Sequence, residues 1–333
     1  MAQASIPILS FFCGAGGLDH GFSREQFRVV LACDNFEPAI HTYNYNAKRD
    51  TARLTDLNTI KAASLIRMIE GQSSDNTPQG VVGGPPCQGF SRGNAKADPN
   101  DPRNLLPFRY AEILSALNEK YKLKFFVFEN VLGLTNATHS ARFYAIWRAF
   151  EKAGFTIFDG QMDAQNFGVA QMRRRLFLVG LNSELFPDAA FIFPSDNGKR
   201  ATIRDVIEGL PQPMFFKHGL KPSDIAYHPN HWTMQPRSKK LMRVASTDGR
   251  SFRKLQWDSV SPTVAYGNRE IHVHPDGGRR LSVLEAMLLQ GFPKRYRLSG
   301  NFSQQITQIS NAVPPPVARA LAKRIRRAIF AKE

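Results

Sequence analysis

Cysteine is scarce in this chain of 333 residues, which contains three, Cys13, Cys33 and Cys87. They form neither a disulfide framework nor a zinc-binding spacing, so we expect no structural disulfide and no metal site. Such sparse cysteine usage is typical of a protein that works in a reducing cytosol.

Long apolar stretches are missing as well. No run of about 18 apolar residues occurs, so we expect no membrane span. Residues 1–5 have neither a basic start nor an apolar core, and we therefore expect no signal peptide. The hydrophobic content of 42% is that of a globular protein, and 333 residues allow two domains.

Acidic residues are outnumbered, because 28 Asp and Glu face 44 Lys and Arg, which gives a net charge of +16. The excess favours a polyanionic partner, above all nucleic acid, although a high charge can also serve solubility alone. Between residues 199 and 269, 13 basic residues stand against 5 acidic ones. Residues 182–258 are rich in proline and poor in periodicity, so this basic region is a predicted base-reading surface.

A stiff loop surrounds Cys87. The apolar residues 80–82 are typical of a buried parallel strand, and the two glycines and two prolines of residues 83–86 end it. Rigid backbone around one thiol suits a nucleophile, because attack requires near-contact geometry. The alternative is an inert cysteine buried in a turn. Residues 92–103, polar and rich in Gly, Pro and Asn, are expected to form a mobile loop that closes over a substrate.

A second pattern lies at the start of the chain. Residues 6–12 read as a buried strand, residues 13–17 are glycine-rich, and residues 18–22 open a helix. The next strand ends in Asp34, 20 residues after Gly14, which is the offset at which a carboxylate meets ribose hydroxyls in nucleotide-binding βαβ units. This pattern fits a dinucleotide or S-adenosylmethionine, since both carry an adenosine ribose.

One glycine of the strict dinucleotide pattern is absent, and Asp19 stands in its place.

Further along, residues 124–128 form an apolar strand that ends in Glu129, which places an acid at the ligand edge of a parallel sheet. The alternative is a surface Glu that caps a helix. In a strand over 171–175, Gln171, Arg173 and Arg175 would share one face and could grip a phosphate or a base carbonyl; a solvated basic edge strand is the alternative.

Several helices are also predicted. Ser282 and Glu285 form a capping box before a helix at 283–290. Apolar residues four apart form one stripe on the last helix. These residues are Val317, Leu321, Ile325 and Ile329.

Together these motifs resemble the DNA (cytosine-5)-methyltransferase family in its compact prokaryotic form, over nearly the whole chain and in the family order. The matching segments are 12–17 for the cofactor motif, 84–88 for the nucleophile motif, 129–131, 171–175, 261–263 with 280–282, and 310–315. Ser10 replaces an Asp that is common in the family, and Ser310 replaces a Gly. Neither departure touches a proposed reacting group.

The resemblance implies a role for each site residue. Cys87 would be the nucleophile, Glu129 would bind the N3 and amino edge of cytosine, and Arg175, supported by Arg173, would hold its carbonyl. S-adenosyl-L-methionine is the implied cofactor. Its expected contacts are Phe12, Gly14, Gly16, Gly17, Asp34, Asp56, Pro86, Leu106, Asn311 and Val313. The expected DNA contacts are Gln88, Ser91, Arg92, Asn94, Arg103, Gln235 and Arg237.

The implied fold is α/β, a doubly wound Rossmann-like sheet of the S-adenosylmethionine-dependent methyltransferases, formed by residues 1–188 and 300–333. A smaller, irregular, mostly β target-recognition domain with the hinge would fill residues 189–299. The enzyme would be a cytoplasmic, nucleoid-associated monomer that acts on double-stranded DNA and flips its target base. It would serve a restriction-modification system with a separately encoded endonuclease, or act as an orphan methylase.

Three other interpretations remain open at this point. A tRNA cytosine-5 methyltransferase shares the catalytic motifs but carries a Cys-Phe-Thr element in its variable region, and no cysteine follows Cys87 in this chain. An inactive DNA-binding relative would not need Cys87, Glu129 and Arg175 together. A nicotinamide dehydrogenase fits the glycine turn alone.

Overall fold

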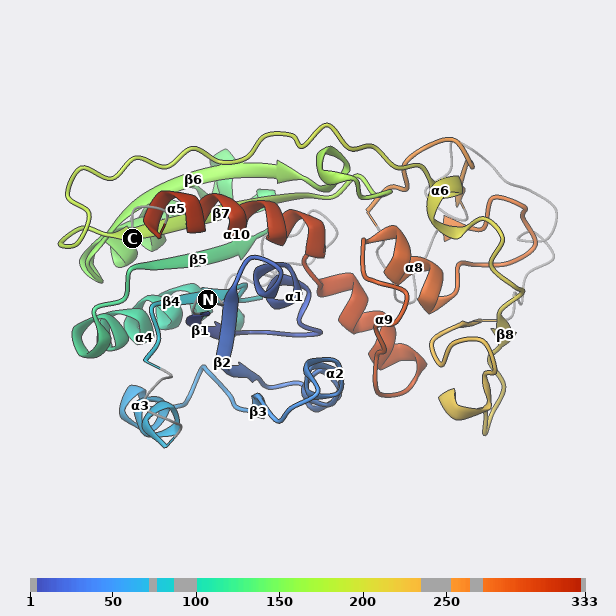
Figure 1. Ribbon diagram of the computed structural model, residues 1–333, viewed down its shortest axis with the longest axis horizontal. Coiled ribbons are helices and arrows are strands. Elements are labelled where there is room, and N and C mark those ends of the chain that lie inside the picture. Colours follow the sequence, from blue (N-terminus) through green and yellow to red (C-terminus); the bar gives the residue numbers. More distant parts are fainter. Residues whose placement is uncertain (1–4, 72–76, 87–100, 235–252, 264–271, 331–333) are drawn as a thin grey trace.

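A sheet of seven strands forms the centre of the part of the molecule that the structure, a computed structural model, describes: residues 5–71, 77–86, 101–234, 253–263 and 272–330. Its strand order is β3-β2-β1-β4-β5-β7-β6 (Figure 1). The strands are β1 (Ile6–Phe11), β2 (Phe27–Asp34), β3 (Ala52–Leu54), β4 (Gly80–Gly83), β5 (Phe125–Asn130), β6 (Phe155–Asp163) and β7 (Arg174–Asn182).

Neighbouring strands from β3 to β5 are parallel, whereas β7 is antiparallel to both β5 and β6. Every residue of β1, β4 and β5 is buried, because helices cover both faces of the sheet. The strands expected from apolar runs are therefore confirmed. One expectation needs correction: β7 begins at Arg174, while Gln171 forms only an isolated bridge with Ser261.

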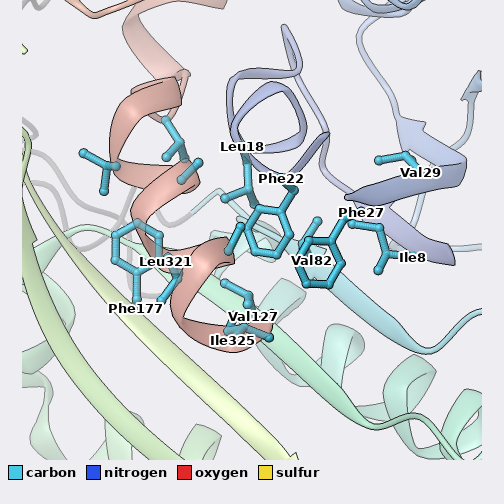
Figure 2. Close-up of a cluster of buried hydrophobic side chains, with 14 of the residues drawn as sticks. Ile8, Leu18, Phe22, Phe27, Val29, Val82, Val127, Phe177, Leu321 and Ile325 are labelled. Carbon is cyan, nitrogen blue, oxygen red and sulfur yellow. The ribbon is translucent and has the colours of Figure 1, made fainter. Parts of the chain in front are cut away.

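Helices pack on the two faces of the sheet. One face carries α1 (Gly17–Ser23), α2 (Glu37–Ala47) and α10 (Pro315–Ile329), and the other carries α3 (Ala62–Glu70), α4 (Leu106–Tyr121) and α5 (Ser140–Lys152). Figure 2 shows Phe22 of α1 and Leu321 of α10 meeting over the strand residues Val82 and Val127. The predicted apolar stripe of the last helix is buried along its whole length, and the helix is held there by this contact. The doubly wound α/β architecture is thus confirmed.

Residues 189–299 contain only short regular elements where they are described. These are α6 (Ile203–Ile207), β8 (Met214–Phe215), β9 (Trp232–Thr233), β10 (Arg253–Lys254), β11 (His272–Val273) and α8 (Val283–Leu289). The capping box is confirmed, since Ser282 Oγ accepts from the Glu285 N–H at 3.1 Å and Glu285 Oε2 accepts from the Ser282 N–H at 2.7 Å. The chain then continues into α9 (Phe302–Asn311).

Short 3₁₀ turns connect several of these elements. They are η3 (Pro102–Leu105), η4 (Leu132–Thr135), η5 (Ala137–His139), η6 (Ala164–Phe167) and η7 (Pro222–Asp224). No helix within the described residues is long and apolar enough to cross a membrane.

Packing runs across both ends of the predicted recognition region. The segment after β7 returns along β6 in Figure 1, and Phe191 packs on Phe158 with ring centroids 6.2 Å apart. At the other end, Trp232 Nε1 donates to Gln305 Oε1 of α9 at 2.8 Å, within an apolar cluster that includes Met287 and Phe302. The division at residues 188 and 300 stays a prediction.

We predict that Leu321→Ala lowers the free energy of unfolding by about 2–5 kcal/mol, because the side chain is fully buried between α1 and the sheet and its loss leaves a cavity. Urea denaturation measures the change. Lys323→Ala, on an exposed position of the same helix, is the matched control and should change stability by about 0.5 kcal/mol or less. Equal losses in the two variants would contradict this packing of α10.

Candidate active site

The carboxyl ends of β1, β4 and β5 open into one cavity of about 1520 Å³. It lies where the chain leaves β1 toward β2 on one side and β4 lies on the other, which is the point at which open α/β sheets bind ligands. All the predicted cofactor residues except Gly16 line it, as do four predicted catalytic or DNA-contacting residues. The lining set includes Phe12, Gly14, Gly17, Asp34, Asp56, Pro86, Leu106, Asn311, Val313, Arg103, Glu129, Arg173 and Arg175.

The glycine turn after β1 is tied to the C-terminal part of the chain. A Cβ atom on Gly17 would lie 2.2 Å from the Val313 carbonyl oxygen, so only glycine permits this approach. A Cβ atom on Gly16 would lie 3.0 Å from both the Tyr43 ring and the Tyr296 hydroxyl, and Gly16 does not line the cavity. Close packing at Gly17 thus brings Val313 beside the turn, although almost 300 residues separate them in the sequence.

Asp34 fixes the other side of the turn. Its Oδ2 accepts a hydrogen bond from the Gly14 N–H at 2.8 Å, and its Oδ1 accepts from the Phe36 N–H at 2.9 Å. Burial raises the pKa of Asp34, and these N–H groups oppose the rise. A carboxylate has about four lone-pair positions, so these two bonds leave acceptor capacity toward the cavity. Phe12 lines the same wall with a positive φ of 54°, a conformation that costs a non-glycine residue about 1 kcal/mol.

Glu129, Arg173 and Arg175 form a charged cluster in the cavity wall. Glu129 Oε1 lies 3.0 Å from Arg175 Nε, and Glu129 is only 8% exposed. Burial raises the pKa of Glu129, while Arg175 and Arg173 lower it and do not fully offset burial. Burial and the neighbouring Arg175 hold the pKa of Arg173 well below its usual range. The cluster therefore combines a buried carboxyl whose pKa is raised with two guanidinium groups.

Arg173 reaches from the residues just before β7 to the C-terminal element. Its Nη2 donates to the Ser310 carbonyl at 2.8 Å, whereas its Nε and Nη1 have no hydrogen-bond partner among the described residues. Gln171 is also fully buried, and Met172 and Arg174 on either side of Arg173 face outward. The alternation predicted for residues 171–175 therefore holds at the buried positions, even though the regular strand starts later.

The loop that leads to Cys87 is fastened to β5. Asn130 Nδ2 donates to the Pro85 carbonyl at 3.2 Å. A Cβ atom on Gly84 would lie 2.7 Å from Glu129 Oε2, so a larger residue here would displace this carboxyl from its position. Pro86, the last described residue before Cys87, lines the cavity. The loop backbone is thereby held directly beside the charged cluster.

Seven of the predicted site residues lie outside the described residues: Cys87, Gln88, Ser91, Arg92, Asn94, Gln235 and Arg237. Arg103 is described, and its Nε donates to Asp101 Oδ1 at 2.9 Å at the cavity edge. The roles assigned to all these residues stay predictions.

Three lining or supporting residues are not identified as site contacts by the sequence. In the sequence, Asn130 is noticeable only as part of the 129–131 motif, yet its side chain donates a hydrogen bond to the Pro85 carbonyl. Thr263 Oγ1 donates to the Met172 carbonyl at 2.7 Å and joins the variable region to the segment before β7. Asp19 lines the cavity from α1. The only signal for Asp19 is its place in a pattern that has glycine there.

The sequence profile of the C-5 cytosine-specific DNA methylases matches residues 6–327. The chain belongs to this family. It is 31% identical to the Type II methyltransferase M.MthTI of Methanothermobacter thermautotrophicus, over 97% of this chain and 98% of that protein. It is 29% identical to the Type II methyltransferase M.FnuDI of Fusobacterium nucleatum, over 98% and 96% of the two chains.

Solved structures agree on the fold. A putative DNA modification methyltransferase encoded within an Escherichia coli prophage matches 99% of this chain and 100% of its own, with a TM-score of 0.79 at 24% identity. Spodoptera frugiperda DNMT2 matches 96% of this chain and 99% of its own, with a TM-score of 0.66 at 18% identity. At these identities the structures support the architecture and nothing further.

Membership makes the protein a DNA cytosine-5 methyltransferase that uses S-adenosyl-L-methionine. The cavity fits this cofactor on its own chemistry. It places a glycine turn with free acceptor capacity at Asp34 beside a second acidic side chain, Asp19, whose two buried oxygens have no partner among the described residues. S-adenosyl-L-methionine has ribose hydroxyls, which can donate hydrogen bonds to such oxygens, and a positive charge, which a carboxylate attracts.

We predict that Gly84→Ala lowers the turnover number at least tenfold, because the added methyl group would displace the Glu129 carboxyl from Arg175. Steady-state methylation of DNA and a thermal melt, run together, separate activity from stability. Gly71→Ala is the matched control, since it lies at the end of α3 with a negative φ. Unchanged turnover in Gly84→Ala would contradict the crowding at this point.

Asp19 gives the protein without cofactor a pH-dependent stability. Burial raises the pKa of Asp19 from 3.8 to about 7. Between these values the folded state binds more protons than the unfolded state, so its stability falls as the pH rises. The pKa difference corresponds to a loss of about 4 kcal/mol once the pH exceeds both values.

The stability gained by Asp19→Asn should therefore grow from pH 5 to pH 7 and level off above about pH 7.5. Urea denaturation of both proteins at each pH measures this difference. Asp188→Asn, at an exposed carboxylate, is the control for the loss of one negative charge. A flat difference for Asp19→Asn would mean that the carboxyl is not desolvated.

Proposed function

We propose that the protein methylates carbon-5 of a flipped-out cytosine in a short, specific double-stranded DNA site, through a covalent adduct with Cys87. The observation that supports this most directly is the Glu129–Arg175 pair, 3.0 Å apart, in the cavity that also holds the glycine turn. In the sequence, Cys87 comes directly after Pro86, and Pro86 lines that cavity. A target base in a stacked duplex cannot reach such a cavity, which is why we include flipping.

The proposed chemistry begins with the Cys87 thiolate, which forms a bond to carbon-6. The electron pair of the carbon-5–carbon-6 double bond then shifts toward the ring nitrogen N3, and Glu129 donates a proton there. S-adenosyl-L-methionine would supply an electrophilic methyl group. Carbon-5 would bond to this methyl group as the methyl–sulfur bond breaks, and the electron pair of that bond would remain on the sulfur of the departing S-adenosyl-L-homocysteine. A base then removes the carbon-5 proton, the carbon-5–carbon-6 double bond re-forms, and the thiolate leaves with the electron pair of the carbon–sulfur bond. N3 returns its proton to Glu129, which restores the acid for the next turnover.

The electrostatics of the cluster suit these steps. Since burial raises the pKa of Glu129, its carboxyl can hold the proton that N3 needs as charge develops. Arg175, next to it, would hold the cytosine carbonyl, and Arg173 would keep the cluster positive from its anchor on Ser310. If the proposed site brings the Cys87 thiol to this cluster, the guanidinium groups would also favour its thiolate, because an adjacent cation lowers a thiol pKa.

The net charge of the chain and the names of its relatives support a DNA substrate and a restriction-modification system. A net charge of +16 suits a DNA duplex, and affinity should fall steeply with salt. The relatives carry the name Type II methyltransferase, so we place the protein in a restriction-modification system with a separate endonuclease, or as an orphan methylase. It would act as a monomer in the cytoplasm on nucleoid DNA, with residues 189–299 as its target-recognition domain and Gln235 and Arg237 among the base readers.

Two variants test the catalytic assignment. Cys87→Ser should abolish methyl transfer while DNA and cofactor binding persist, and the unaltered protein should form a covalent adduct with DNA that carries 5-fluorocytosine. Glu129→Gln should lower the turnover number by about 10²–10⁴-fold with little change in DNA affinity. Glu119→Gln, at an exposed position on α4, is the matched control and should be fully active.

Transfer of labelled methyl groups to DNA, single-turnover rates and binding titrations measure these effects. Near-normal turnover by Cys87→Ser would remove the nucleophile assignment. If Glu129→Gln changed only the Michaelis constant, Glu129 would be a binding residue and not a proton donor.

A further inference from the structure

Asp19 has no use in the mechanism above, and its environment is unusual for a carboxylate. It is 4% exposed, and neither of its side-chain oxygens has a hydrogen-bond partner of normal geometry among the described residues. The Ser10 hydroxyl on β1 is also buried; it lies near enough to Asp19 to lower the pKa of that carboxyl, but has no partner of normal hydrogen-bond geometry in the described part of the chain. Both residues line the cavity that belongs to the cofactor. A buried charge without a partner is costly, so a ligand that supplies donors is the expected complement.

The side chains around Asp19 do not neutralise it. Burial is the main cause of the raised pKa values of the neutral groups Cys13, Tyr43 and Tyr296 close by, and the charge of Asp19 adds to it. Burial dominates the raised pKa of Asp19 itself, and the nearby Ser10 hydroxyl and its own N–H offset only part of this. Asp19 therefore presents either a carboxylate or a protonated carboxyl to the cavity. When it is ionised, no cationic side chain among the described residues neutralises its charge.

The bound cofactor brings two cationic groups to this cavity, the sulfonium and the α-ammonium group of its methionyl moiety. A sulfonium has no N–H, so it cannot donate a hydrogen bond to an orphaned oxygen. An ammonium group has three donors and no acceptor. Next to the glycine turn, the groups without a partner of normal geometry among the described residues are the two carboxylate oxygens of Asp19 and the hydroxyl of Ser10. The number and kind of these acceptors match an ammonium group and not a sulfonium.

We propose that Asp19, with Ser10 beside it, binds the α-ammonium group of S-adenosyl-L-methionine and so selects a cofactor that carries a free amino acid end. The proposal rests on the cofactor use described above. The proposal assigns different parts of the cofactor to two acidic residues. Asp34, at the end of β2, would bind the nucleoside, whereas Asp19, on α1 after the glycine turn, would bind the amino acid end. Gly17 and Val313 close the wall between the turn and the C-terminal element.

Calorimetric binding of S-adenosyl-L-methionine and of two analogues tests this in the full-length protein without DNA. S-adenosyl-L-homocysteine keeps the amino acid end but has no sulfonium charge, and 5′-methylthioadenosine lacks the amino acid altogether. Asp19→Asn should weaken S-adenosyl-L-homocysteine about 10- to 100-fold, as expected for the loss of a charge-assisted hydrogen bond in a buried site. It should leave the affinity for 5′-methylthioadenosine within about twofold, which also shows that the variant is folded.

A second variant keeps the test decisive if Asp19→Asn does not fold. Ser10→Ala retains the carboxylate and removes one acceptor, so it should weaken S-adenosyl-L-homocysteine about threefold to tenfold and leave 5′-methylthioadenosine unchanged. Glu25→Gln is not suitable as a control, because Glu25 pairs with Arg319; Asp188→Asn, at an exposed site, should bind both ligands normally.

The remaining outcomes overturn the proposal in distinct ways. Equal weakening of both ligands would make Asp19 a structural residue. Loss of S-adenosyl-L-methionine binding with S-adenosyl-L-homocysteine unaffected would make it a partner of the sulfonium. Unchanged affinities would mean that water satisfies its oxygens. If the unaltered protein bound neither methionyl ligand, the cofactor use would fail, and not the role of Asp19 alone.

Discussion

The burial of charged side chains at the carboxyl edge of the sheet is the constraint on which the site depends. Glu129, Arg173 and Arg175 lose most of their hydration there, and each needs a partner within reach. The rigid strands β5 and β7 hold Glu129 and Arg175 at the distance of a salt bridge. The same burial disfavours the charged form of Glu129. It therefore raises the pKa of this carboxyl and makes it better suited to exchange a proton.

Close backbone contacts then assemble the rest of the site around these charges. Gly84 lets the loop toward Cys87 pass the Glu129 carboxyl, and Gly17 lets the glycine turn meet Val313. Each contact joins elements that are far apart in the sequence. Because a methyl group at either glycine would collide with a neighbouring oxygen, the geometry of the cavity is controlled from positions that take no part in the chemistry.

Glu129 and Asp19 illustrate two ways to use a buried acid. Glu129 has two arginines that offset part of its burial, whereas Asp19 is surrounded by neutral groups and has a raised pKa of about 7. A buried acid beside arginines, as at Glu129, suits a group that takes part in proton transfer. A buried acid among neutral groups, as at Asp19, suits a group that is neutralised only when a cationic ligand binds. The protein without cofactor would carry the cost of Asp19, and cofactor binding would relieve it.

Local sequence patterns are enough to predict the apolar strands β1, β4 and β5, the last helix and the motif residues, because buried parallel strands are continuous apolar runs and the motifs are short. The edge strand β6 is not predicted, because its residues alternate between buried and partly exposed positions. The local patterns also place Glu129 and Asp34 at strand ends, where a parallel sheet collects them. Which atoms meet depends instead on the folded chain. The approach of Gly17 to Val313, the bond from Arg173 to Ser310 and the isolation of Asp19 arise from packing between segments remote in sequence, and no local pattern encodes such distances.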